Sequence, residues 1–128
     1  MKKLTLLLLL MVSTNLLAEW TEVITYVPVT IYVDYQSIIR IGNKVEMSFL
    51  QDYKSVYTVG NIRMLSVKSR GEYFCEENKS RLLNYYWYSE NMGQGNIVFG
   101  KDNVNDESRT VTGISFDDGL FKIACGEK

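Results

Sequence analysis

Residues 38–49 read IIRIGNKVEMSF, and this stretch decides the fold. In its second half, Val45, Met47 and Phe49 alternate with polar residues, which is the period of a β-strand that buries one face. The Gly-Asn pair at 42–43 separates this run from a preceding apolar run, and such a pair is typical of a tight hairpin turn. The stretch therefore predicts an antiparallel hairpin with one buried face.

The chain on both sides of this hairpin is also β-prone. Stretches rich in β-branched and aromatic residues predict further strands at 30–34, 63–75, 81–88 and 96–99. Gly71 interrupts the second of these stretches, which predicts either one bent strand with a bulge or two joined strands. We expect the strands to form an antiparallel meander of about six strands.

The C-terminal region changes to a helical period. Ser115 followed by Asp118 forms a capping box, and Gly126 is placed to end the helix. One face of this helix carries the apolar residues Phe116, Leu120, Ile123 and Ala124. Gly119 inside the helix costs about 1 kcal/mol, so packing has to hold it in place. The predicted fold class is α+β, mainly β, with one short C-terminal helix.

The first eighteen residues have the layout of an export signal. Lys2 and Lys3 precede the apolar run 4–12, and residues 13–18 are more polar and end at Ala18. We predict a signal peptide over 1–18 that is cleaved, and a single domain over 19–128 in the periplasm or outside the cell. An uncleaved N-terminal anchor stays open as the alternative. No cysteine lies near Ala18 that could carry a lipid anchor. Association with the cell surface is therefore in doubt and stays open.

Cys75 and Cys125 are the two cysteines of the chain. In an oxidising compartment we expect them to form a disulfide, which closes a loop of about fifty residues and stabilises the fold by about 4 kcal/mol. A redox-active pair normally has its cysteines close together in sequence. A metal site with two thiolates and no histidine is less expected still. The disulfide would fix the C-terminal helix to the end of a strand.

Composition argues against several classes of function. The chain has no histidine, so it lacks the commonest general base and metal ligand, although carboxylate chemistry stays open in principle. Residues 19–128 contain 12 basic and 15 acidic side chains, which gives a net charge of −3. The basic residues are scattered, which argues against a nucleic-acid partner. We expect a non-catalytic protein without metal or cofactor, and without a membrane span after cleavage.

An aromatic run is the main candidate for a binding patch. On a strand, Tyr85 and Trp87 face one side while Tyr86 and Tyr88 face the other. Tyrosine and tryptophan are common interface anchors, so Tyr86, Trp87 and Tyr88 are the candidate binding residues. One side of the strand has to belong to the core. The other side either is a partner-binding patch or, as the alternative, is covered by the C-terminal helix.

Four short motifs together resemble the surface-adhesin protein E family over about residues 30–126. They are Tyr32-Val33-Asp34 with Ser37-Ile38, Cys75 in a strand, Trp87-Tyr88 followed by Gly93-Gln94-Gly95, and Ile123-Ala124-Cys125. The resemblance implies an antiparallel sheet of about six strands with a C-terminal helix tied on by a disulfide.

For function, the resemblance implies an exported binding protein whose partner is a host matrix or envelope protein. The family's founding member is a surface lipoprotein that also binds haem. Haem is not expected here, because without histidine the iron would need Tyr or Met ligands. The competing hypothesis is a soluble periplasmic structural, ligand-binding or inhibitor protein.

Overall fold

The structure is a computed structural model that describes residues 19–104, 107–111 and 116–126. The predicted signal peptide, residues 1–18, lies outside the described residues. So does Ser115, the first residue of the predicted capping box.

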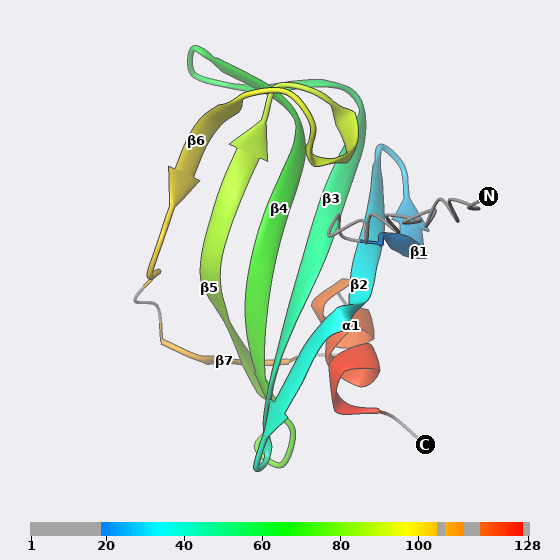
Figure 1. The fold of residues 1–128 in the computed structure, drawn as a ribbon, viewed down its shortest axis with the longest axis vertical. Coiled ribbons are helices and arrows are strands. Elements are labelled where there is room, and N and C mark those ends of the chain that lie inside the picture. Colours follow the sequence, from blue (N-terminus) through cyan, green and yellow to red (C-terminus); the bar gives the residue numbers. More distant parts are fainter. Residues whose placement is uncertain (1–18, 105–106, 112–115, 127–128) are drawn as a thin grey trace, which may run out of the picture.

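One antiparallel sheet and one helix make up the fold (Figure 1). The strands are β1 (Thr21–Tyr26), β2 (Val29–Ile41), β3 (Lys44–Val59), β4 (Ile62–Phe74), β5 (Lys79–Tyr88), β6 (Ile97–Lys101) and β7 (Arg109–Thr110). The first six are neighbours in chain order, and the short β7 pairs with β5. A 3-10 turn, η1 (Asn91–Gly93), precedes β6, and α1 (Phe116–Cys125) ends the fold. The predicted meander and the α+β class are confirmed.

The predicted hairpin lies at the centre of the sheet. The turn at 42–43 joins β2 to β3, and Ile41 pairs with Lys44 across it. β3 continues to Val59, ten residues past the predicted strand, and turns into β4 with Val59 opposite Ile62. Residues 54–59 are all exposed. They show no alternation between buried and exposed positions, so the sequence pattern that predicts a strand is missing here.

Gly71 lies within a single strand, β4, where a close contact requires a glycine. The pairing of β4 with β5 shifts between Arg70 and Gly71, so Leu83 is an extra residue on β5. A Cβ atom on Gly71 would lie 2.6 Å from the hydroxyl oxygen of Tyr73. The Tyr73 ring therefore lies over Gly71, and Tyr73 is only 1% exposed.

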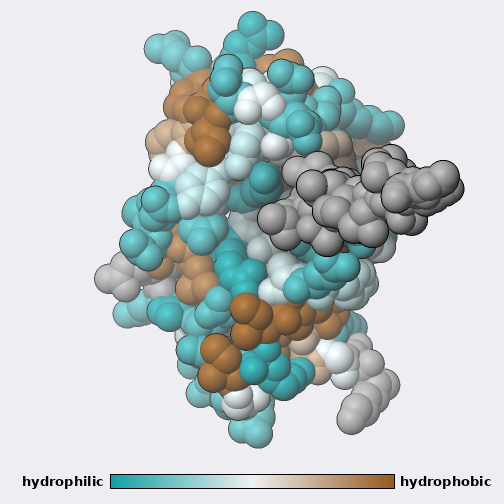
Figure 2. All heavy atoms as spheres, viewed as in Figure 1, coloured by the Kyte–Doolittle hydropathy of each residue, from teal (hydrophilic) through white to brown (hydrophobic). Residues whose placement is uncertain are grey.

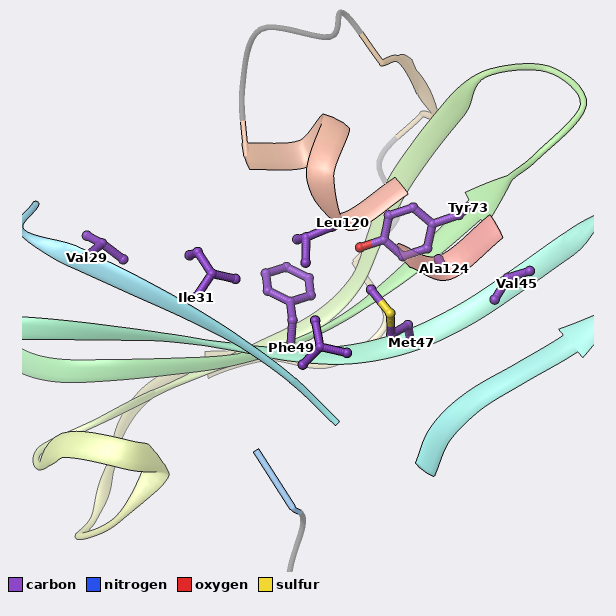
Figure 3. Packing of buried hydrophobic residues seen from close by; sticks show 9 residues of the cluster. Val29, Ile31, Val45, Met47, Phe49, Tyr73, Leu120 and Ala124 are labelled. Atoms are coloured by element: carbon purple, nitrogen blue, oxygen red, sulfur yellow. The ribbon is translucent and has the colours of Figure 1, made fainter. Parts of the chain in front are cut away.

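The hydrophobic core lies between α1 and one face of the sheet (Figure 3). Val45, Met47 and Phe49 point to this side of β3, as their alternation predicts. Leu120 and Ala124 of α1 lie above them and are buried. The core is completed by residues of the neighbouring strands, Val29, Ile31, Val33 and Tyr73. This face, called the helix face below, holds nine of the fourteen buried hydrophobic residues in the described part of the chain.

Two contacts hold the helix on the sheet. Cys75, directly after β4, forms the predicted disulfide with Cys125 in the last turn of α1, with the Cα atoms 5.6 Å apart. At the other end, a Cβ on Gly119 would lie 2.7 Å from Cδ1 of Ile24. Gly119 weakens the isolated helix, but it lets the helix lie close to β1.

Candidate functional site

The second face of the sheet carries mainly polar side chains over β3 and β4. Because side chains alternate along a strand, residues between the core positions of β3 and β4 point away from α1. On β3 these are Glu46 and Ser48, and on β4 they are Lys68, Arg70 and Glu72. We call this surface the open face.

Arg70 is fixed at the centre of the open face. Its Nε donates to Glu46 Oε1 at 3.1 Å, and its remaining nitrogens donate to Ser48 Oγ at 2.9 Å and to the backbone oxygen of Ser37 at 3.1 Å. Ser37 lies in the stretch where the β2–β3 register shifts, between Asp34 and Ile39. Arg70 therefore ties this irregular part of β2 to the sheet, and its planar fork is held in one orientation.

Glu72 is buried on the open face although it carries a carboxylate. It is 2% exposed, and its two oxygens lie 2.6 Å from Arg81 Nε and 3.3 Å from Lys44 Nζ. A carboxylate taken out of water needs such partners to offset its lost hydration. The open face therefore carries a fixed arrangement of paired charges.

A groove of about 320 Å³ lies beside Arg70 on the open face. It is lined by Trp20, Asp34, Ser48, Lys68, Ser69, Arg70, Asn84, Tyr86 and Tyr88, and we call it the open-face groove. The Lys68 Nζ lies 4.9 Å from the centroid of the Tyr88 ring, within the range of a cation–π interaction. The groove thus combines aromatic surfaces with cations and hydrogen-bonding groups.

The structure divides the three candidate binding residues between two places. Tyr86 and Tyr88 line the open-face groove. Trp87 points to the opposite side, where its ring centroid lies 4.9 Å from that of Phe99 on β6. Tyr85 also stacks on Phe99, at 6.1 Å, and neither Tyr85 nor Trp87 belongs to the cluster under α1. The two tyrosines form one site, and Trp87 belongs to another.

Sequence reasoning missed the other residues of the groove. Trp20 precedes β1, Asp34 lies on β2 and Lys68 on β4, so register across the sheet brings them together. The one local signal is that Lys68, Arg70 and Glu72 alternate with less polar positions on β4. That alternation marks a polar face, but it does not indicate which other strands contribute to it.

A second cavity of about 420 Å³ lies on the helix face, at the N-terminal end of α1. Phe49, Leu82 and Phe116 supply apolar walls, and the Ser80 hydroxyl donates to Asp117 Oδ2 at 2.8 Å. Burial raises the pKa of the Tyr73 phenol at its floor far above the usual 10.0, and nearby Asp117 raises it further. Within the described part of the chain, no cluster of three or more His, Cys, Asp or Glu residues could hold a metal ion.

Comparison with known families agrees with this architecture. Residues 20–126 match the sequence model of the family described as surface-adhesin protein E. The chain belongs to the surface-adhesin protein E family. The resemblance of the four short motifs is therefore confirmed, and adhesin-like binding is the kind of function that the family supports. A comparison with curated protein sequences finds no match.

Solved structures of Haemophilus influenzae protein E share the family fold. One structure has 16% sequence identity and a TM-score of 0.61, covering 88% of each chain. A second crystal form also has 16% identity, with a TM-score of 0.62, and covers 88% of this chain and 91% of that one. The structure of protein E from non-typeable H. influenzae has 16% sequence identity and a TM-score of 0.55, and the match covers 88% of this chain and 79% of that one. At this identity the likeness shows the shared fold alone.

The helices in the described part of the chain are short. Among residues 19–104, 107–111 and 116–126, none is long and apolar enough to cross a membrane.

Proposed function

We propose that this chain is an exported, non-catalytic binding protein that contacts a host matrix or envelope protein through the open-face groove. Residues 1–18 would direct export and be removed. Membership of the surface-adhesin protein E family supports the binding role. The observation that carries the choice of site is the groove itself, in which Trp20, Tyr86 and Tyr88 lie beside Lys68 and Arg70.

The chemistry of the groove suits a protein surface. Tyrosine and tryptophan provide large contact areas and lose little conformational entropy, and they are the usual anchors of protein interfaces. Arg70 is already held by three acceptors, so little ordering of its side chain would oppose binding. The groove therefore offers a site that is organised before a partner arrives.

Substitution of the two tyrosines tests this site. The double variant Tyr86→Ala/Tyr88→Ala and the control Tyr35→Ala would be compared on immobilised host matrix proteins. Tyr35 is 49% exposed on β2 and does not line the groove. We expect the double variant to lose at least about tenfold in affinity and the control to bind like the wild type. Equal binding by all three proteins would rule out the groove as the contact site.

The competing function is a soluble periplasmic ligand-binding, structural or inhibitor protein. The cavity at the N-terminal end of α1 favours this alternative, because apolar walls with a few polar groups are typical of small-molecule sites. Protease added to intact cells separates the two hypotheses. An adhesin should be degraded, whereas a periplasmic protein should stay intact and be released by osmotic shock.

A further inference from the structure

Exposed apolar side chains gather at one end of the sheet. Among the described residues, eleven large hydrophobic side chains are exposed, and six of them lie on two elements. Val56, Tyr57 and Val59 lie on the β3–β4 hairpin, and Ile97, Val98 and Phe99 lie on β6. Each of these six residues is between 36% and 58% exposed. We call these six residues the apolar end.

Strand register places both groups at the same end of the sheet. Tyr57 pairs with Met64, two residues before Ser66, which is about 7 Å along β4. Ser66 pairs with Tyr88, and Tyr88 pairs with Ile97. Figure 1 shows the tip of the hairpin and the start of β6 at the top of the molecule. Figure 2 shows hydrophobic residues gathered at the upper left of the same view, over β6.

The hairpin tip projects beyond the rest of the sheet. The pairing of β2 with β3 extends to Tyr53, and the pairing of β5 with β4 begins at Ser66. Between these limits, Tyr57–Val59 pairs only with Ile62–Met64, so the tip is a two-stranded ribbon. Such a ribbon exposes side chains on both faces, which explains why 54–60 is exposed throughout.

The charged side chains of the hairpin tip are both positive. Residues 53–63 contain Lys54 and Arg63 and no aspartate or glutamate, in a chain whose net charge is −1. At the base of the tip, Asp52 accepts hydrogen bonds from Asn91 and Met92. Neither of the two cations takes part in the four ion pairs between described residues. The exposed apolar side chains of the hairpin tip thus lie on the same ribbon as two cations.

We propose that the apolar end docks on an anionic lipid surface. Val56 and Val59 would enter the boundary between head groups and acyl chains, and Tyr57 would lie at the interface, where aromatic side chains with a polar tip are favoured. Lys54 and Arg63 would contact the acidic head groups. A projecting, two-sided tip suits a fluid surface that closes around it, and a weak apolar contact combined with two cations gives reversible binding.

This site is separate from the open-face groove. None of its six residues lines the groove, so docking on lipid would leave Trp20, Tyr86 and Tyr88 available to a protein partner. The inference therefore does not depend on the proposed function, and either one can fail alone.

Vesicle flotation tests the inference with the protein purified after export. We expect it to float with vesicles of phosphatidylglycerol and phosphatidylcholine, to remain behind with pure phosphatidylcholine, and to be released by salt. The variant Lys54→Glu/Arg63→Glu should lower partitioning at least about tenfold, since each cation contributes roughly fivefold. Val56→Ser/Val59→Ser should lower it to a similar extent.

A matched control comes from the opposite end of the sheet. Ile39 and Ile41 are 51% and 56% exposed beside the 42–43 turn, and Ile39→Ser/Ile41→Ser should float like the wild type. Circular dichroism would verify that each variant is folded. The inference is overturned if anionic vesicles bind no protein or if the control loses as much binding as the tip variants. Tip-dependent binding to polyglutamate but not to vesicles would also overturn it, and would indicate an acidic protein partner.

Discussion

The helix face and the open face belong to the same strands but are built in different ways. On β3, Val45 and Met47 are fully buried under α1, whereas Glu46 and Ser48 on the other side are bound to Arg70. Packing and a disulfide hold the helix face together, while hydrogen bonds and ion pairs organise the open face. The difference implies that stability and binding depend on separate side chains, which substitutions can test.

The largest expected effect is on the helix face, at the disulfide. Replacing both cysteines, in Cys75→Ala/Cys125→Ala, removes a cross-link between residues 50 apart and should lower the free energy of unfolding by about 4 kcal/mol. Urea denaturation of the variant and the wild type measures this loss. Two free thiols in the unfolded, unreduced wild type would show that the bond does not form.

Removing a core side chain of α1 should have the next largest effect. Leu120 is fully buried against the sheet, so Leu120→Ala should cost about 3 kcal/mol through lost burial and the cavity that remains. Thermal unfolding gives the value, and Lys122→Ala, on the exposed side of the same helix, is the control. If both substitutions cost the same, α1 is not held by its apolar face.

Tyr73 makes the helix face sensitive to alkaline pH. Burial raises the pKa of its phenol above the usual 10.0, so the folded protein keeps a proton that the unfolded chain loses. This contribution to stability is complete below about pH 10 and falls by about 1.4 kcal/mol for each pH unit above it. Denaturation of the wild type and Tyr73→Phe at several alkaline pH values measures the difference. The variant should show the weaker pH dependence, and parallel curves would contradict the assignment.

The smallest effect on stability is expected on the open face. Tyr88 is half-buried, and its main polar contact is the Lys68 ammonium over its ring. Tyr88→Ala should therefore cost less than about 1 kcal/mol of stability while it weakens partner binding. A loss as large as that of Leu120→Ala would show that the open face also carries the fold, and the separation of the two faces would fail.

The accuracy of the sequence predictions follows the range of the interactions behind them. The strand through Val45, Met47 and Phe49 was predicted because the burial of one face produces a local period. The outer half of β3 was missed because its residues are exposed on both faces and follow no period. Among the candidate binding residues, Tyr86 and Tyr88 were brought into one groove, but Trp87 was placed against Phe99.

The sequence by itself determined the meander, the C-terminal helix and the bond between Cys75 and Cys125. These features follow from residue spacing and from the number of cysteines, which neighbours along the chain already reveal. The tertiary structure alone decided that Trp20, Lys68 and Tyr86 share a groove, and that Glu72 is buried between Lys44 and Arg81. Those contacts depend on the register of several strands, and a shift of one residue would turn each side chain to the other face.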